Sequence, residues 1–226
     1  MPLINYGKQF LDNSDISNVK KVLKSNFLTQ GSEVEKFENQ LKKKLKAKYC
    51  SAVSSGTAAL HLLGLALGWK KNDVVITTPL SFVATSNSIL YAGAQPVFVD
   101  IDYKSGNICP NNLDKKIKEL RKKKKKIKAV IAIDYGGCPG EWRQLRSITK
   151  KNKILLINDG CHGLGARINN NFAYAIKYAD FITYSFHPVK PITTGEGGAI
   201  VTNDKFINDR IKKLRSHGIV RNVKKY

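Results

Sequence analysis

The chain is poor in the residues that build metal centres and disulfide-bonded folds. Its four cysteines (Cys50, Cys109, Cys138 and Cys161) are scattered and form no Cys-x-x-Cys pair. The four histidines likewise lack the spacing of metal ligands. This pattern predicts reduced thiols in the core or in loops and argues against a disulfide framework or a zinc site. We therefore expect no bound metal.

Long apolar runs and a signal-type N-terminus are also lacking. No apolar stretch approaches the roughly 20 residues that a helix needs to cross a bilayer. Residues 1–8 show no basic segment followed by an apolar one, as a secretory signal would. We therefore expect a cytoplasmic protein without a membrane partner.

Acidic residues are few relative to basic ones. The chain has 39 Lys and Arg but 17 Asp and Glu, a formal net charge of +22, which raises the question of a nucleic-acid partner. The densest basic run, residues 121–126, lies between a predicted helix and a predicted strand, without a recognised nucleic-acid module or an aromatic platform. A solvated linker is the favoured interpretation, so we expect no nucleic acid. A basic nucleic-acid-binding protein stays open as a remote alternative.

Short apolar segments alternate with amphipathic ones along the chain. Amphipathic helices are predicted near residues 16–23 and 34–45. Short strands then alternate with helices; the strands are predicted at 49–53, 74–77, 96–99, 129–133, 154–157, 181–184 and 199–202. This alternation predicts an α/β fold with a mostly parallel sheet and helices on both faces. We expect an N-terminal arm or helix over residues 1–30 and one large domain over residues 31–226.

The most informative stretch is residues 182–202. It places Lys190 after an apolar strand and before a Thr/Gly-rich turn and a second apolar strand. An ammonium group is costly to bury, so such a lysine is either paired or chemically used. Lysine amines form Schiff bases with carbonyls, including the aldehyde of pyridoxal phosphate (PLP). A PLP site would also need an acid for the ring nitrogen, a phosphate cradle and a ring-stacking aromatic.

Candidates for all three lie upstream, each at a predicted strand end. Asp159 follows a short apolar strand, where ligands bind in open α/β sheets and a carboxylate could hold the ring nitrogen protonated; a capping or turn aspartate is the alternative. Gly56 and Thr57 begin an apolar helix whose N–H groups favour a phosphate, unless Ser55 or Thr57 is an ordinary N-cap. Phe82 would stack on a planar ring or simply belong to the core.

In this order the motifs resemble the DegT/DnrJ/EryC1/StrS family of PLP-dependent sugar aminotransferases. The lysine motif is the most specific part of the resemblance, which runs from near residue 4 to about residue 220. The matching segments are Tyr6-Gly-Lys-Gln-Phe10, Leu28-Thr-Gln-Gly31, Ser55-Gly-Thr-Ala-Ala-Leu-His61, Phe98-Val-Asp-Ile-Asp102, Asp159-Gly-Cys-His162, Ser185-Phe-His-Pro-Val-Lys190, Thr193-Thr-Gly-Glu-Gly-Gly198 and Ser216-His-Gly-Ile219.

The resemblance implies a PLP-binding large domain of the aspartate-aminotransferase type (fold type I). It implies that Lys190 is the Schiff-base lysine and proton shuttle, and that Asp159 is the partner of the ring nitrogen. His162 stands where the family places a Gln or His that hydrogen-bonds the ring hydroxyl. These three roles are expectations from likeness.

The remaining roles follow from the same resemblance. Ser185 and the backbone of Gly56 and Thr57 would hold the phosphate, and Phe82 would stack on the ring. The implied reaction moves an amino group from L-glutamate to C4 of a UDP-linked 4-keto-6-deoxy-N-acetylhexosamine, as in pseudaminic acid biosynthesis. Another NDP-keto-sugar stays open as the acceptor.

Family members continue past the Ser216-His-Gly-Ile219 segment into a small C-terminal domain. The resemblance therefore implies that this small domain is missing and that the large domain is incomplete relative to the family. It also implies a homodimer. A catalytically silent PLP-binding fragment is the alternative to an active enzyme.

Overall fold

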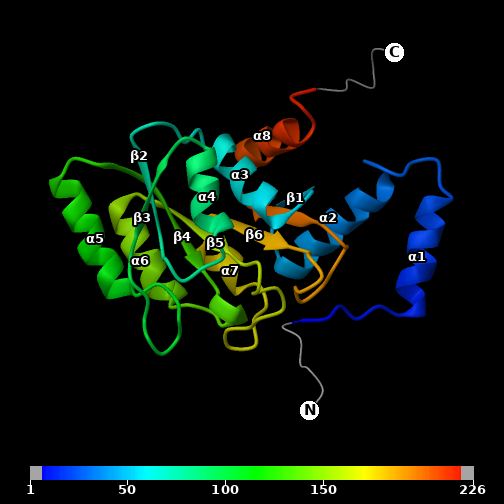
Figure 1. Ribbon diagram of the computed structural model, residues 1–226, viewed down its shortest axis with the longest axis horizontal. Helices are drawn as coiled ribbons and strands as arrows, with labels where there is room; N and C mark the ends of the chain where they lie inside the picture. Colours follow the sequence, from blue (N-terminus) through cyan, green and yellow to red (C-terminus); the bar gives the residue numbers. More distant parts are fainter. Residues whose placement is uncertain (1–6, 220–226) are drawn as a thin grey trace.

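Short runs of buried residues form a seven-stranded sheet in the computed structural model, which describes residues 7–219 (Figure 1). The strands are β1 (Tyr49–Val53), β2 (Asp73–Thr77), β3 (Gln95–Phe98), β4 (Lys126–Ile133), β5 (Leu155–Asp159), β6 (Phe181–Ser185) and β7 (Gly198–Thr202). Their order is β1-β7-β6-β5-β4-β2-β3. Pairings among β2 to β6 are parallel, whereas β7 is antiparallel to β1 and β6. The predicted mostly parallel sheet is confirmed.

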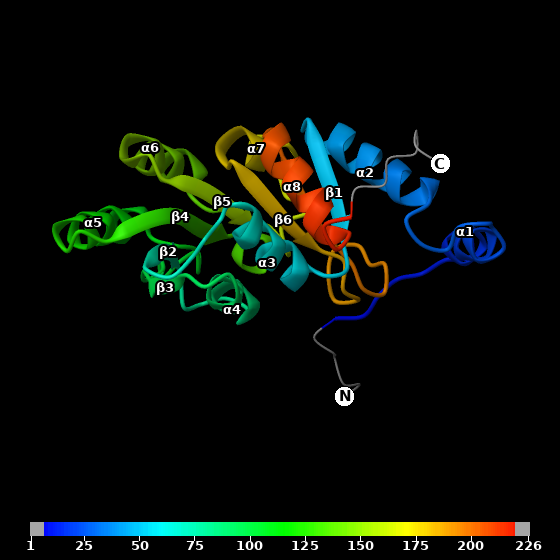
Figure 2. The same ribbon diagram turned by 90° about the horizontal axis from the view of Figure 1, so that it is seen from above.

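Helices cover both faces of this sheet, as predicted (Figure 2). They are α1 (Asn13–Leu23), α2 (Ser32–Leu45), α3 (Gly56–Ala66), α4 (Ala84–Tyr91), α5 (Pro110–Lys122), α6 (Trp142–Asn152), α7 (Tyr174–Tyr178) and α8 (Lys205–Arg215), with a 3₁₀ turn at Tyr135–Gly137. Residues of α2, α5, α6 and α7 belong to one buried apolar cluster, and residues of α3, α4 and α8 belong to the other. Both faces of the sheet are therefore dry.

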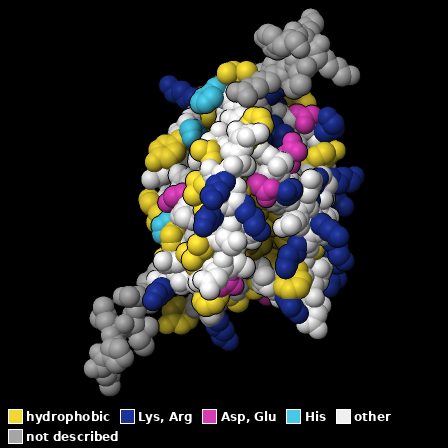
Figure 3. Space-filling model, turned by 90° about the vertical axis from the view of Figure 1, so that its right-hand side faces the viewer, with side chains coloured by type: hydrophobic (Ala, Val, Ile, Leu, Met, Phe, Trp, Pro, Cys, Tyr) yellow, Lys and Arg dark blue, Asp and Glu magenta, His cyan; other side chains and the backbone are white. Residues whose placement is uncertain are grey.

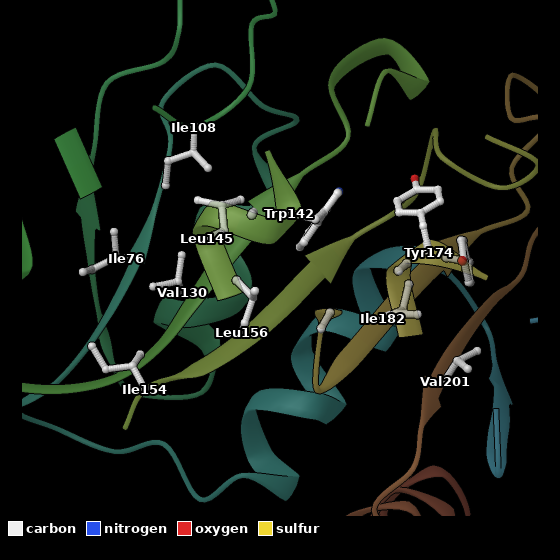
Figure 4. Packing of buried hydrophobic residues seen from close by; sticks show 14 of the residues in the cluster. Ile76, Ile108, Val130, Trp142, Leu145, Ile154, Leu156, Tyr174, Ile182 and Val201 are labelled. Atoms are coloured by element: carbon white, nitrogen blue, oxygen red, sulfur yellow. The ribbon is translucent and has the colours of Figure 1, made fainter. Parts of the chain in front are cut away.

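Alternation along the strands divides their side chains between the two clusters. In β2, Val74 and Ile76 belong to the α6 side and Val75 belongs to the α3 side, because successive strand residues point to opposite faces. Figure 4 shows Trp142 and Leu145 of α6 on the first of these sides. A strand buried on both faces reads as a continuous apolar run, which is why the strands were recognisable in the sequence.

Three local features differ from the sequence expectations. The sequence also predicts a helix over residues 81–91, but α4 begins only at Ala84, after a turn that follows β2. The short helix α7 was not predicted, because five residues are too few to show a helical period. Asp159 is the last residue of β5, with Ile133 and Thr183 as its Cα partners, whereas the strand predicted at 154–157 placed it just past the end.

Helix α1 stands apart from the sheet at the right of Figure 1 and buries none of its residues. Its start is fixed locally by Asp12, whose side chain accepts from the N–H groups of Ser14 and Asp15 in a capping box. Residues 1–6, with Tyr6 of the matching motif, and residues 220–226 lie outside the described part. The division into residues 1–30 and 31–226 stays a prediction.

No helix within residues 7–219 combines the length and apolar character needed to cross a bilayer. In the same range, no three His, Cys, Asp or Glu side chains gather as a metal site would require. All four cysteines carry free thiols.

Ile182 is the second residue of β6 and is completely buried (0% exposed). Truncation to alanine removes packed methylene groups and leaves a cavity, so we expect Ile182→Ala to lower the free energy of unfolding by about 2–5 kcal/mol. The same substitution at Ile16, exposed on α1, should change it by less than about 0.5 kcal/mol. Urea unfolding followed by circular dichroism measures both values, and equal losses would contradict a fully packed β6.

Candidate active site

The carboxyl ends of the parallel strands open into a cavity of about 880 Å³. This volume lies within the roughly 300–1,000 Å³ typical of small-molecule sites. The structure brings together all seven residues that the sequence nominated, and each lines this cavity: Lys190, Asp159, His162, Ser185, Gly56, Thr57 and Phe82. Segments that are far apart in the sequence therefore meet at one edge of the sheet.

Lys190 lies on the loop between β6 and β7, and its side chain meets His162. The Lys190 Nζ is 2.7 Å from the His162 Nε2. An ammonium group has no acceptor, so Nε2 accepts this bond and the ring proton of neutral His162 is on Nδ1. Burial is the main reason that the pKa of His162 is lowered, and the positive charge of Lys190 is the second. The pair thus favours a neutral imidazole at neutral pH.

Asp159 presents a buried carboxylate at the end of β5, with 6% of the residue exposed. Thr85 Oγ1 donates to its Oδ2 at 2.7 Å, and the N–H of Cys161 donates to its Oδ1 at 3.3 Å. Thr85 is itself 2.7 Å from the hydroxyl of Ser81. Sequence reasoning missed Thr85; its position three residues after Phe82 was the one available sign.

The N-terminus of α3 forms an open cradle beside β6. Ser55 is the N-cap, because its hydroxyl accepts from the N–H of Ala58 at 3.0 Å. This is the capping alternative that the sequence left open, and it leaves Gly56 and Thr57 at the start of the helix. A Cβ on Gly56 would lie 2.8 Å from the Ser185 Cβ. The lack of a side chain at Gly56 therefore lets the helix start pack against Ser185, and the first N–H groups of a helix favour an anion.

Phe82 is not a core residue, since it is 72% exposed at the mouth of the cavity. The core interpretation offered by the sequence is therefore wrong. An exposed aromatic ring at the mouth of a cavity is available to cover a planar ligand.

A second buried carboxylate at the cavity, Asp134, was not predicted. Its Oδ1 accepts from the indole N–H of Trp142 at 2.9 Å and from the N–H of Gly140 at 3.2 Å. Its Oδ2 accepts from the Tyr174 hydroxyl at 2.6 Å and from the Asn158 side-chain amide at 3.0 Å. Burial raises the pKa of Asp134 and the four hydrogen bonds oppose this rise. The available signal was its position directly after the apolar run of β4.

The fold and the residues that line the cavity define the class of this domain. It is the large domain of PLP-dependent aminotransferases, and the similar solved structures are aminotransferases of this class. Residues 9–226 match the DegT/DnrJ/EryC1/StrS aminotransferase family, and the chain belongs to that family. Members of this family depend on PLP. The family expectation from the sequence is confirmed.

Three relatives illustrate the likeness. The chain is 42% identical over 219 residues to a UDP-4-amino-4,6-dideoxy-N-acetyl-beta-L-altrosamine transaminase of Campylobacter jejuni, covering 97% of this chain and 56% of the relative. PseC of Helicobacter pylori, an aminotransferase involved in pseudaminic acid biosynthesis, has 35% identity and a TM-score of 0.85 over 96% of this chain and 57% of PseC. NtdA of Bacillus subtilis, solved with bound cofactor PMP, is 30% identical to this chain, with a TM-score of 0.81. The match covers 94% of this chain and 48% of NtdA. The chain spans about half the length of these relatives.

The depressed pKa of His162 can be measured directly. A lowered folded-state pKa means that the imidazole binds its proton at a lower pH than the ordinary value of about 6.5, and the bond from Lys190 is lost as the pH falls through the lowered value. We expect Lys190→Met to raise the titration midpoint of His162, because the neighbouring positive charge is removed. NMR titration of the imidazole signals measures both midpoints. Lys104→Met, a lysine outside the cavity lining, is the control; an equal shift in both variants would contradict the pairing.

Proposed function

We propose that the protein is a PLP-dependent aminotransferase that moves an amino group from L-glutamate to C4 of a UDP-linked 4-keto-6-deoxy-N-acetylhexosamine. The convergence of Lys190, Asp159 and the Gly56 cradle in one cavity is the observation that carries this proposal. The acceptor is taken from the likeness to the transaminase of Campylobacter jejuni, which covers about half of that protein.

The residues at the cavity fit PLP. Gly56 places a helix N-terminus suited to a phosphate against Ser185, at a separation that a Cβ would not allow. Ser185 and the N–H groups of Gly56 and Thr57 would hold the phosphate. Phe82 would cover one face of the ring from the cavity mouth, and His162 would hydrogen-bond the ring hydroxyl.

The chain's own residues supply positioning and proton transfer. When bound, PLP supplies an electron sink for the bonds broken at the α-carbon of the amino donor. Asp159 would keep a proton on the ring nitrogen of the bound cofactor, because a buried carboxylate stabilises a neighbouring positive charge. Lys190 Nζ takes up the proton released from the α-carbon of L-glutamate and, in the second half of the reaction, provides a proton to C4 of the sugar. His162 keeps this amine at the cavity.

We also infer a homodimer and a cytoplasmic location. Large apolar side chains are exposed on α4 and in the turn before it, namely Phe82, Val83, Leu90 and Tyr91. Such a patch is typical of a protein interface, so a second copy is the occupant we propose. The free thiols of all four cysteines agree with a reducing compartment.

A catalytically silent PLP-binding protein is the second candidate. The same cavity residues would hold PLP whether or not transfer of an amino group follows. The absorption spectrum of the protein with PLP, before and after L-glutamate, separates the two. We expect a protein-bound pyridoxal band that L-glutamate converts to the pyridoxamine form. A band that glutamate leaves unchanged would support the silent alternative, and the absence of a band would contradict PLP binding.

Lys190→Ala should abolish both the conversion by L-glutamate and the transfer to the sugar while PLP still binds without a covalent bond. The reason is that no other lysine lines the cavity among the described residues. Borohydride reduction and peptide mass spectrometry should place the cofactor on the peptide with Lys190 in the unsubstituted protein and on no peptide in the variant. Lys104→Ala serves as the matched control. A Lys190→Ala protein that still aminates the sugar would refute the assignment.

Gly56→Ala should weaken PLP binding by at least about tenfold. The new methyl group would lie 2.8 Å from the Ser185 Cβ and 3.2 Å from the Cys161 Sγ, so it would displace Ser185, which we propose as a phosphate ligand. Gly140→Ala is the matched control, because its Cβ would make an ordinary contact at 3.6 Å with Asn107. Fluorescence titration with PLP measures both affinities. Unchanged affinity in Gly56→Ala would show that the phosphate is bound elsewhere.

A further inference from the structure

We propose that Thr85 is a positioning residue that keeps Asp159 ionised when the cofactor is bound, so that the proton shared by Asp159 and the ring nitrogen stays on the nitrogen. This inference rests on the proposed function, because it concerns how Asp159 acts on bound PLP. Thr85 is 1% exposed and is not among the described residues that line the cavity. Its effect on the cofactor would therefore pass through Asp159.

The sheet topology brings the Thr85 hydroxyl to the Asp159 carboxylate. Thr85 is the second residue of α4, which follows β2, and Asp159 is the last residue of β5. Strands β2 and β5 lie on the two sides of β4, so the first turn of α4 reaches past the end of β4 to the end of β5. Thr85 Oγ1 lies 2.7 Å from Asp159 Oδ2. Hydroxyl donors to a charged oxygen typically lie at about 2.5–2.7 Å, so this distance fits an ionised acceptor.

Counting protons fixes the direction of the hydrogen bonds. A hydroxyl has one proton, and an ionised carboxylate can only accept. Thr85 therefore donates to Asp159, and its oxygen accepts in the 2.7 Å contact with Ser81. The other acceptor within reach of the Ser81 proton is the backbone oxygen of Phe82, at the longer distance of 3.1 Å.

The two hydroxyls thus form a short chain that points at the carboxylate. Ser81 lines the cavity, Thr85 is buried, and Asp159 is the final acceptor. Hydrogen bonds that run in one direction polarise and strengthen one another. Ser81 therefore supports the donor role of Thr85.

Thr85 provides the stronger of the two hydrogen bonds recorded for the Asp159 carboxylate. The other comes from the N–H of Cys161, which donates to Oδ1 at 3.3 Å. One donor on each oxygen fixes the plane of the carboxylate and leaves each oxygen with further acceptor capacity. A hydrogen bond to the charged form of a group favours that form. Most of this stabilisation is expected from the shorter bond of Thr85.

Burial makes this support necessary. Asp159 is 6% exposed, and removal from water disfavours the charge of a carboxylate. Without the Thr85 hydroxyl, a proton shared with the ring nitrogen would move toward the carboxylate oxygen. A ring without that proton is a weaker electron sink.

The other titratable and charged neighbours do not replace Thr85. Burial raises the pKa of the Cys161 thiol, and Asp159 raises it further, so Cys161 stays neutral. His162 also favours its neutral form, because burial and then Lys190 lower its pKa. Lys190 is the amine that reacts with the cofactor under the proposed function, so it is not a fixed charge. Basic side chains on the outside of the molecule, such as those on the face in Figure 3, are screened by salt.

The experiment records the ¹⁵N NMR signal of PLP labelled at its ring nitrogen and bound to the full chain. Free PLP at acid and alkaline pH gives the limits for the protonated and the neutral nitrogen. We expect Thr85→Val, which removes the hydroxyl and keeps the volume, to lower the ratio of protonated to neutral nitrogen by about tenfold. This is the effect of one hydrogen bond to a charged group. Thr85→Ser keeps the hydroxyl and should stay close to the unsubstituted protein.

Thr202→Val is the matched control. Thr202 is also 1% exposed, and its hydroxyl donates to the backbone oxygen of Asp180 at 2.9 Å. Its loss should leave the nitrogen signal unchanged. If Thr85→Val does not fold, Ser81→Ala takes its place, and its signal should move in the same direction by a smaller amount.

A protonated nitrogen that neither Thr85→Val nor Ser81→Ala changes would overturn this inference alone. An equal shift in Thr202→Val, or in Thr85→Ser, would also overturn it, because the Thr85 hydroxyl would then not be the cause. Asp159→Asn separates these results from a failure of the proposed function. If the unsubstituted protein and Asp159→Asn give the same signal, the role of Asp159 is wrong, and if PLP does not bind, the proposed function is wrong. Both of those results would overturn the inference as well.

Discussion

The register of β4, β5 and β6 decides which side chains meet at the cavity. The Cα partners of Asp159 are Ile133 on one side and Thr183 on the other, so the three parallel strands end close to one level. Asp134, Asp159 and Ser185 therefore reach the same edge of the sheet. A slip of one residue would turn every side chain of a strand to the opposite face and move the Asp159 carboxylate away from the cavity. The dry packing on both faces prevents such a slip, because it would also disturb the apolar contacts of the strand.

Hydrogen-bond counting assigns different roles to the two buried carboxylates. A carboxylate accepts about four hydrogen bonds. Asp134 already accepts four, two on each oxygen, from Trp142, Gly140, Asn158 and Tyr174. It is saturated, and its effect is to tie together the segments that follow β4 and β5. Asp159 accepts one hydrogen bond on each oxygen, so it retains capacity for a donor in the cavity. Of the two, only Asp159 can bind a protonated ring nitrogen without losing a native partner.

The sequence was sufficient for features that local patterns encode. Strands buried on both faces read as apolar runs, and their ends marked the positions of Lys190 and Gly56. Features created by long-range contacts were not accessible in this way. Thr85 is recognisable as part of the site only through its contact with Asp159, which is 74 residues away, and the Asp134 cluster joins three elements. Phe82 was ambiguous for the same reason, since its exposure depends on what packs around the strand mouth.

The parallel sheet also separates the two ways in which this protein presents positive charge. Helices that follow parallel strands point their N-termini at the cavity edge and their C-termini at the opposite edge. At the cavity, an anion is met by the backbone N–H groups of Gly56 and Thr57 and the hydroxyl of Ser185, among loops that carry more acids than bases. At the opposite edge, exposed lysines close to the starts of β2, β4 and β5 present full charges. Salt strongly screens exposed charges. It screens short, partly buried hydrogen bonds much less. Anion binding at the two edges should therefore respond differently to ionic strength, because the topology assigns neutral donors to one edge and lysines to the other.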